Sequence, residues 1–426
     1  MNLEIENIRL INPYTDTDSI VNIIIHNGII QQIGPDVKLP KLSDKINGEG
    51  LVISPGLIDI HVHLREPGYE YKETIKTGTD SAANGGFTAV VCMPNTNPDI
   101  DNIEVINYIK EKARGLAVDV LISAAITQKR KGQELTDMNE LHQHGVVLFT
   151  DDGAPVDRAD IMSFAFEYAK EKDLILSQHC EESSLTSNFV MNESVVSQKL
   201  GLPGYPNIAE EITLFRDVKL AEHHGNRRYH AQHLSTAGAV EIIRNAKSKG
   251  LRVTCEVTPH HFILEDTNLE SLSSDYKMNP PLRRGNDIQK IIEGIKDGTI
   301  DCIATDHAPH SIEEKSRELH KTPNGIIGLE TALGLSMTFL VHKGLISIND
   351  LIKLMSVNPR NILNLEPINF EIGDKINATI FDPNDVWTVN KDLFRSKSRN
   401  TPFNNYKLKG KPKYILNNNK LVKCEL

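Results

Sequence analysis

Two histidines in one short segment carry the clearest chemical signal in this sequence. His61 and His63 lie in the run LIDIHVHLREPG, residues 57–68, whose apolar, β-branched beginning predicts a buried strand. Side chains two residues apart on a strand point to the same face, so both imidazoles should leave its C-terminal end together. Imidazole suits zinc and related metals, so the pair could supply half of a metal site. Taken alone, the pair would also fit one hydrogen-bonded core histidine and one exposed histidine.

Eight apolar, β-branched segments predict the strands that must position such a site. They lie near residues 57–63, 87–93, 119–126, 146–150, 174–179, 228–233, 252–258 and 301–305. Helical patterns occupy the intervals, for example residues 71–84, 103–114, 159–172, 209–224, 237–249 and 287–297, and residues 329–342 and 348–363 follow the last strand. Eight strands alternating with helices predict an α/β fold, a closed (β/α)8 barrel of the TIM type.

The two ends of the chain have a different pattern. Residues 1–52 and 366–426 contain short alternating segments separated by Gly, Asn and Pro turns, with a hairpin turn predicted at residues 417–419. Neither end is large enough to form a secure core alone. We therefore expect them to combine into one small β-sandwich beside a catalytic barrel of residues 53–365.

Composition excludes several classes of function. The formal net charge is −10, from 47 basic and 57 acidic residues, and no long basic run appears, which argues against nucleic-acid binding. No segment approaches the roughly 20 apolar residues of a membrane span, and the N-terminus does not look like a secretory signal. The five cysteines are widely separated, which predicts buried thiols in a reducing cytoplasm and no disulfide framework.

Polar residues able to bind metals or hydrogen-bond a ligand follow nearly every predicted strand. Barrel enzymes place their chemistry at these C-terminal strand ends. The residues are His61, His63, Arg65, Asn95, Asp151, Asp152, His179, His230, His233, His260, His261, Asn279, Asp306, His307 and His310. Any one of them could be a helix cap or turn former, but their recurrence at the same edge predicts a shared site.

Some of these residues keep two interpretations. His230 and His233 are three residues apart on one strand, so only one of them is expected to be a ligand. His260 and His261 remain open between site and core. Glu181 and Glu182 fit a solvated cap or an outer partner of the metal ligands. Histidines in helical or interhelical polar stretches are expected at the surface; these are His142, His144, His223, His224 and His342.

Five longer motifs resemble those of the amidohydrolase superfamily and, within it, the bacterial dihydroorotases that hold an Asp between two zinc ions. The resemblance covers the whole chain and rests on HVHLREPG (61–68), MPNT (93–96), FTDDG (149–153), KMNPPLR (277–283) and IATDHAPH (303–310). It implies a hydrolase that interconverts N-carbamoyl-L-aspartate and L-dihydroorotate in pyrimidine (UMP) biosynthesis. It also implies two Zn²⁺ per subunit, held by His61, His63, Asp152, His179, His233 and Asp306, with Asp306 as the catalytic proton carrier.

The residue that bridges the two metals is a point of departure from many relatives. Those relatives carry a carbamylated Lys at the end of the fourth barrel strand, whereas this chain has VVLFTDD at residues 146–152 and no Lys. A carboxylate must therefore bridge. The resemblance implies Asp152, and the alternative is Asp151, which is expected to point the other way.

The resemblance also implies residues that bind the substrate. Arg65, Asn95 and His310 would hold its α-carboxylate, and Asn279 would contact the amide edge of the ring. Asn324 and Gly325 would add backbone contacts, although this chain has Asn324 where many relatives carry an aromatic residue. The polar segment 311–324 fits either a shield over the site or a plain solvated loop.

Two other functions compete with this interpretation. One is a cyclic amidase for a neutral ring (a dihydropyrimidinase, hydantoinase or allantoinase), which would leave Arg65 without its carboxylate partner. The other is a non-catalytic dihydroorotase-like scaffold of aspartate carbamoyltransferase, which would have no need for a full ligand set. We expect a small-molecule substrate, a homodimer and an association with aspartate carbamoyltransferase, and neither nucleic acid nor membrane as a partner.

Overall fold

Eight parallel strands form the sheet that holds the predicted site. In the computed structural model, which describes residues 1–38 and 44–426, their order is β15-β14-β13-β10-β9-β8-β7-β6. An additional bridge between Val62 and His307 joins the two edges and closes the barrel. The strands are β6 (Leu57–Val62), β7 (Phe87–Cys92), β8 (Asp119–Ala124), β9 (Val146–Phe149), β10 (Leu176–Gln178), β13 (Tyr229–Ala231), β14 (Val253–Val257) and β15 (Cys302–Ile303). The predicted (β/α)8 barrel is confirmed.

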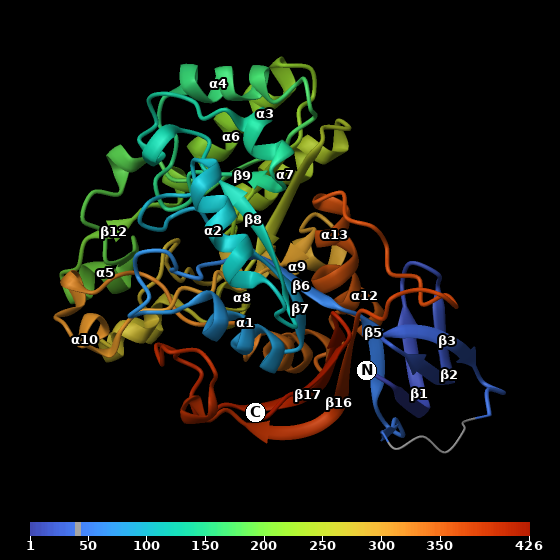
Figure 1. Ribbon diagram of the computed structural model, residues 1–426. Coiled ribbons are helices and arrows are strands. Elements are labelled where there is room, and N and C mark those ends of the chain that lie inside the picture. Colours follow the sequence, from blue (N-terminus) through green and yellow to red (C-terminus); the bar gives the residue numbers. More distant parts are fainter. Residues whose placement is uncertain (39–43) are drawn as a thin grey trace.

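Helices surround this barrel (Figure 1). The main ones are α1 (Ile75–Asn84), α2 (Ile103–Ala113), α3 (Met138–Gln143), α4 (Ala159–Tyr168), α6 (Asn207–His223), α7 (Ala237–Ser248) and α9 (Asn286–Asp297). Shorter ones are α5 (Val195–Leu200), α8 (Pro259–Ile263) and α10 (Ile312–Lys315), and a two-strand ribbon pairs β11 (Met191–Asn192) with β12 (Gly204–Tyr205). Side-chain caps mark several helix starts; the Asn102 side chain, for example, accepts a hydrogen bond from the Val105 amide.

The helical segments after β15 differ from the predicted continuous helices. The first consists of α11 (Ala332–Ser336) and a π-helical turn at Met337–Val341. The second consists of α12 (Ile348–Ile352), a π-helical turn at Lys353–Val357 and α13 (Asn358–Ile362). Apolar spacing predicts where a helix lies, but it does not distinguish a π-helical turn from an α-helical one.

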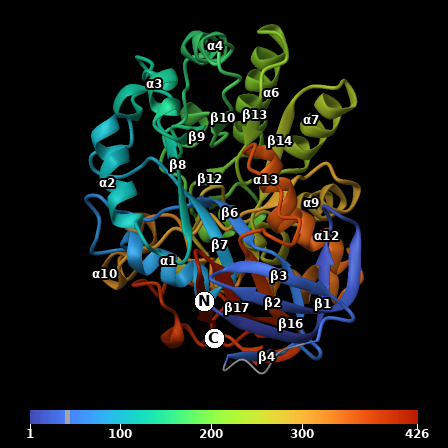
Figure 2. The same cartoon turned by 45° about the vertical axis from the view of Figure 1, so that its right-hand side comes forward.

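The predicted combination of the two chain ends beside the barrel is confirmed, and the strands of both ends form one additional sheet. Its order is β18-β17-β16-β5-β1-β2-β3, with β4 paired to β1. The antiparallel pairing of β5 with β16 joins the two ends of the chain into this one sheet. Figure 2 shows β16 and β17 from the last end of the chain beside β1, β2 and β3 from the first. Its strands are β1 (Leu3–Asn12), β2 (Thr17–His26), β3 (Ile29–Gly34), β4 (Lys45–Asn47), β5 (Val52–Pro55), β16 (Ala378–Thr388), β17 (Lys407–Asn417) and β18 (Lys420–Lys423).

This terminal sheet has an apolar core of its own. Ile5, Ile23 and Ile53 from the first end pack with Ile380 and Leu416 from the last. The predicted hairpin turn lies between β17 and β18, where Asn418 and Asn419 have φ values of 50° and 59°, as a type I′ turn requires. The domain boundaries at residues 52 and 365 stay a prediction.

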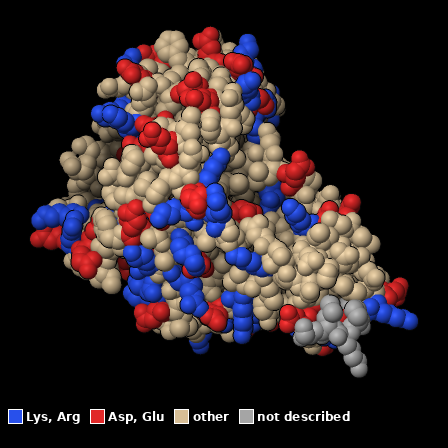
Figure 3. Space-filling view, viewed as in Figure 1, with Lys and Arg blue, Asp and Glu red and all other residues tan. Residues whose placement is uncertain are grey.

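The surface carries charges of both signs. In Figure 3, acidic and basic side chains lie intermixed over the visible face. Among the described residues, no helix combines the length and apolar character needed to cross a membrane.

One buried side chain ties the terminal sheet to the barrel and gives a test of this fold. The two N–H groups of the Asn417 amide are shared among three acceptors within hydrogen-bond distance of Nδ2, which are the carbonyls of Thr88 (3.1 Å) and Ala117 (3.0 Å) and an Asp119 carboxylate oxygen (3.0 Å). Asn417→Ala leaves these acceptors without their donor, so we expect the free energy of unfolding to fall by about 1–3 kcal/mol. Denaturant unfolding measures the change. Asn245→Ala on the exposed side of α7 is the control, and equal unfolding midpoints for both variants would contradict the tie.

Candidate active site

The predicted site residues meet at the C-terminal ends of the barrel strands. All of the ligand and substrate-binding residues expected from the sequence, except His61, line one cavity of about 230 Å³. His61 is fully buried beneath it. A larger hollow of about 910 Å³ lies between α2 and the start of β8, at the opposite end of the barrel, and contains none of these residues. The smaller cavity is therefore the candidate active site.

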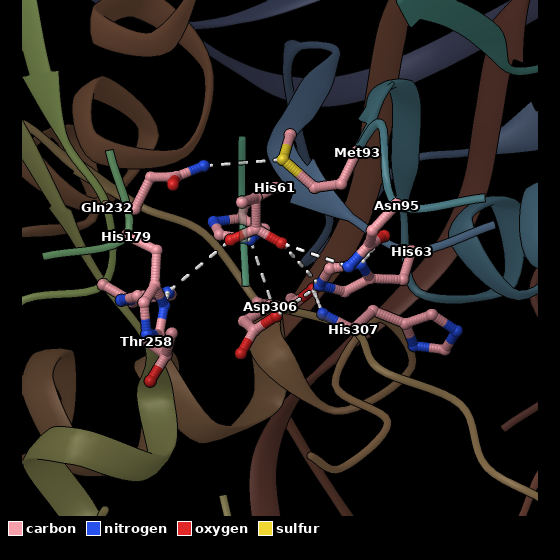
Figure 4. Close-up of polar contacts among 12 residues, drawn as sticks. His61, His63, Met93, Asn95, His179, Gln232, Thr258, Asp306 and His307 are labelled. Carbon is pink, nitrogen blue, oxygen red and sulfur yellow. Dashed lines mark hydrogen bonds and ion pairs between the residues drawn. The ribbon is translucent and has the colours of Figure 1, made fainter. Parts of the chain in front are cut away.

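Two groups of ligand atoms share the carboxylate of Asp152. In the first group, His61 Nε2 lies 3.3 Å from Asp152 Oδ1, and His63 Nε2 lies 3.5 Å from Asp152 Oδ2 and 2.9 Å from Asp306 Oδ1. In the second group, His179 Nδ1 lies 2.9 Å from His233 Nε2, which is 4.0 Å from Asp152 Oδ1. Figure 4 shows His61, His63, His179 and Asp306 turned toward one another.

These spacings fit metal coordination. A tetrahedral zinc site with ligands at about 2.0–2.1 Å places neighbouring ligand atoms roughly 3.3 Å apart. The residues also form two ligand clusters, one of His61, His63 and Asp152 and one of Asp152, His179 and His233. His61 Nε2 is buried and has no hydrogen-bond partner, as expected of a lone pair reserved for a cation. The site is therefore suited to metal binding, with Asp152 common to both clusters.

Three of the histidines are oriented by an oxygen acceptor behind the site. His61 Nδ1 lies 2.6 Å from Glu256 Oε1, His63 Nδ1 lies 2.8 Å from Asn95 Oδ1, and His179 Nε2 lies 2.8 Å from Glu181 Oε2. Because these oxygens accept hydrogen bonds, the ring nitrogen facing each one carries the proton. The opposite ring nitrogen is then left with a lone pair directed at the cavity, as metal-ligating histidines require.

Glu256, from β14, was not predicted from the sequence. It is buried, and besides His61 it accepts hydrogen bonds from His230 Nε2 (3.1 Å) and the His233 amide (3.2 Å). Burial disfavours its charge, but the charges of His61 and His230 and their hydrogen bonds outweigh this effect and lower its pKa. The one feature of the sequence that could have revealed Glu256 is that it is a single acid within a mostly apolar strand. His230 does not line the cavity, but its hydrogen bond to Glu256 supports the site from outside.

Asp59, two residues before His61, is a second buried acid missed by sequence reasoning. Its carboxylate accepts hydrogen bonds from the backbone amides of His61 (3.1 Å) and Thr305 (3.1 Å). It thus links β6 to the segment that follows β15 and brings the His pair close to Asp306. Burial raises its pKa to about 7, against the lowering effect of those hydrogen bonds.

The two central carboxylates are held in their charged form by the histidines. Burial favours protonation of Asp306, but when His61 and His63 are protonated on both ring nitrogens, the hydrogen bond from His63 and the charges of both rings bring the pKa of Asp306 to about 2. Asp152 is also buried, and in the same protonated form the charge of His61 lowers the pKa of Asp152 well below the usual value. Two neighbouring buried anions require positive charge beside them. This requirement is a second reason to expect cations in the site.

The structure shows which of the residues with two possible roles lie outside the cavity. Asp151 points away from the cavity and accepts hydrogen bonds from the Thr127 amide (3.0 Å) and hydroxyl. His261 bonds to Thr258 and to the Pro280 carbonyl, and the buried His260 lies against its ring. None of Asp151, His260 and His261 lines the cavity.

Arg65 and His310 form one wall of the cavity. The Arg65 side chain is buried, its Nε donates to the Pro309 carbonyl (3.2 Å), and its Nη2 lies 3.4 Å from His310 Nε2. Within the described ranges 1–38 and 44–426, no Asp or Glu lies within ion-pair distance of this guanidinium. A buried guanidinium without a carboxylate partner can pair with an incoming anion.

The segment 311–324 reaches the cavity at its end, where Asn324 is one of the lining residues. Lys277 Nζ donates to the carbonyls of Leu319 (2.8 Å) and Thr322 (2.7 Å), which holds the segment against the barrel. At its end, the Asn324 carbonyl accepts a hydrogen bond from His310 Nε2 (2.8 Å). Gly325 has a φ of +119°, and a Cβ there would lie 2.5 Å from the Ala308 Cβ, so only glycine fits this wall.

Comparisons with known proteins agree with this geometry. A family model described as "Dihydro-orotase-like" matches residues 50–239. The chain is 45% identical to a dihydroorotase of Geobacter metallireducens over 99% of both chains, and 44% identical to a dihydroorotase of Acetivibrio thermocellus over 97% of both. Among solved structures, L-hydantoinase (dihydropyrimidinase) from Arthrobacter aurescens is similar with a TM-score of 0.88 at 22% identity, over 99% of this chain and 96% of that one.

The barrel, the His and Asp clusters and these likenesses define the class of protein. It is a hydrolase of the cyclic-amide type, built on a (β/α)8 barrel with a site suited to metal. Within this class, the chain belongs to the dihydroorotase family. The hydantoinase likeness, at 22% identity, shows the shared fold.

The two adjacent aspartates provide a matched test of the bridge. Asp152→Ala removes a carboxylate common to both clusters, so we expect metal content per subunit to fall sharply. Asp151→Ala removes a carboxylate that faces Thr127, so we expect a smaller loss of metal. Elemental analysis after dialysis against a fixed free-metal concentration compares the two. The reverse order would show that Asp151 is the bridging residue.

Proposed function

We propose that this protein catalyses the reversible cyclisation of N-carbamoyl-L-aspartate to L-dihydroorotate in pyrimidine biosynthesis. The observation that carries the proposal is the buried Arg65 guanidinium, which lines the same cavity as Asp152 and Asp306 and has no carboxylate partner among the described residues. A substrate with both a cyclic amide and a carboxylate would satisfy the metal-suited cluster and this guanidinium together. The dihydroorotases at 44–45% identity support this choice.

We further propose two zinc ions per subunit. His61, His63 and Asp306 would hold the first, His179 and His233 would hold the second, and Asp152 would bridge them. When bound, such ions lower the pKa of water and polarise a carbonyl group. The neutral nitrogens and carboxylate oxygens of these residues are suitable zinc ligands.

Asp306 is the proposed proton carrier. In hydrolysis, water adds to the ring amide carbon, and Asp306 accepts its proton and delivers it to the ring nitrogen as the carbon–nitrogen bond breaks. In cyclisation, the ureido nitrogen attacks the carbon of the side-chain carboxylic acid, and Asp306 takes the nitrogen's proton and passes it to the departing hydroxyl, which leaves as water. The pKa of Asp306 is lowered below its usual value, so its carboxylate is ionised at neutral pH and able to accept a proton.

The substrate carboxylate would bind at the wall formed by Arg65 and His310. The Arg65 fork matches a carboxylate in shape and charge. The structure adds a detail about Asn95, whose Oδ1 accepts from His63 while its Nδ2 lies 3.4 Å from Asp152. Its proposed contact with the substrate would therefore be made by a group that also orients a metal ligand.

The competing functions account for fewer of these features. A neutral-ring amidase would leave the buried Arg65 guanidinium without a carboxylate in direct ion-pair contact. A non-catalytic scaffold would have no use for the ligand groups that meet around Asp152.

We also propose a cytoplasmic location, which suits five buried free thiols. The homodimer and the association with aspartate carbamoyltransferase remain predictions, which size-exclusion chromatography of the separate and mixed proteins would test.

Asp306→Asn tests the proton transfer. The amide keeps the size of the side chain but cannot accept the proton, and a positioned acid or base contributes about 10²–10⁴-fold to rate. We expect kcat for L-dihydroorotate hydrolysis to fall at least about a hundredfold. Metal content is measured in parallel. A variant within about tenfold of the parent, with metal unchanged, would remove Asp306 from this role.

Arg65 tests the choice of substrate. A charge-assisted hydrogen bond is worth about 1.5–3 kcal/mol, so Arg65→Met should lose roughly ten- to a hundredfold in kcat/KM on dihydroorotate. Its weak activity on dihydrouracil, which lacks the carboxylate, should change little. Arg65→Lys keeps the charge but loses the planar fork, so its kcat/KM on dihydroorotate should lie between those of the parent and Arg65→Met. Parallel losses on both rings would mean that Arg65 only braces the wall of the cavity.

A further inference from the structure

We propose that Glu181 is a positioning residue that sets the polarity of both a metal-site histidine and a substrate-facing amide. One of its carboxylate oxygens holds the ring proton of His179 and turns the Asn279 side chain so that its carbonyl oxygen faces the cavity. That oxygen would accept a hydrogen bond from a ring N–H of the substrate. The inference rests on the proposed function, because it specifies how the site recognises a cyclic amide.

Glu181 stands between these two residues. It follows β10 and precedes a helical turn at Ser183–Leu185, and its side chain is only 12% exposed. Its Oε2 lies 2.8 Å from His179 Nε2 and 2.8 Å from Asn279 Nδ2. Its Oε1 accepts a hydrogen bond from the Thr186 hydroxyl, which fixes the carboxylate plane. The side chain is therefore mostly shielded from solvent and connects His179 with Asn279, so the solvated-cap interpretation is wrong for this residue.

The contact with His179 decides which of its ring nitrogens is free. An ionised carboxylate only accepts hydrogen bonds, so His179 Nε2 must carry the proton. Its Nδ1 then holds the lone pair, and this is the atom that lies 2.9 Å from His233 Nε2. Glu181 thus directs the lone pair of His179 toward the second ligand cluster.

The contact with Asn279 decides which end of the amide faces the cavity. Because Nδ2 donates to Glu181, Oδ1 is the end that remains, and it is buried without a hydrogen-bond partner. Asn279 lines the cavity, so an acceptor is available there for a ligand donor. Turning the amide over would set Oδ1 against Glu181 Oε2, an unfavourable meeting of two acceptors. A ring N–H supplies the donor that Oδ1 lacks.

Three variants test this role in the full-length, zinc-loaded enzyme. Glu181→Ala releases the Asn279 amide, so we expect KM for L-dihydroorotate to rise roughly three- to tenfold, the loss of one neutral hydrogen bond. Its zinc affinity, measured by chelator competition without substrate, should fall about 10–100-fold. Glu181→Gln can present an amide oxygen to His179 and Asn279 and should recover most of both losses. The neighbouring Glu182→Ala is the control, because Glu182 bonds to Ser184 outside the cavity.

A double-mutant cycle with Asn279→Ala separates positioning from a general structural effect. If Glu181 acts on KM through Asn279, Glu181→Ala should add little to KM once Asn279 is already truncated. Full additivity in KM, or zinc affinity and KM equal to those of the parent, would overturn the proposal. Failure of the proposed function would look different, because the parent enzyme itself would then not turn over L-dihydroorotate.

Discussion

The site depends on the burial of two carboxylates, Asp152 and Asp306, side by side at the mouth of the barrel. Anions taken out of water are unstable unless positive charge and hydrogen-bond donors surround them. The four histidines of the ligand clusters and the Arg65 guanidinium meet this need, and metal cations would meet it further. The ends of several strands therefore have to converge, because no single element could bring so many compensating groups to one point.

Oxygen acceptors on neighbouring residues determine which ring nitrogen of three histidines faces these carboxylates. Glu256, Asn95 and Glu181 each hold one ring nitrogen of a different histidine, so the opposite nitrogen faces the cavity. His233 differs, since its Nδ1 is buried without a hydrogen-bond partner. His61 on β6 is thus held by Glu256 on β14, and His63 is held by Asn95 after β7, whereas the partner of His179 lies two residues further along its own segment. A substitution of Glu256 on β14 would therefore alter the orientation of His61 at the end of β6.

The sequence was sufficient to predict the barrel and the residues that meet in its cavity. Alternating strands and helices indicated the barrel, and the spacing of His61 and His63 indicated a shared face. Glu256 and Asp59 escaped notice because a lone acid in an apolar strand reveals its partners only when a distant strand lies beside it. Glu181 remained open between cap and partner, since both interpretations fit a polar residue after a strand. The π-helical turns were missed because helical periodicity does not register one extra residue per turn.

The pairing of β5 with β16 has a consequence for how this protein is made. Ile53 of β5 lies opposite Ile380 of β16, so the first strands to leave the ribosome cannot complete their sheet until almost the whole chain has been synthesised. At roughly 5–20 residues per second, the apolar face of β1 and β2 must wait tens of seconds for the residues that cover it. During that time it is open to wrong pairing, as unpaired strands are. Ribosome-associated chaperones would therefore matter most for the N-terminal strands, and a chain that stops before β16 would leave them uncovered.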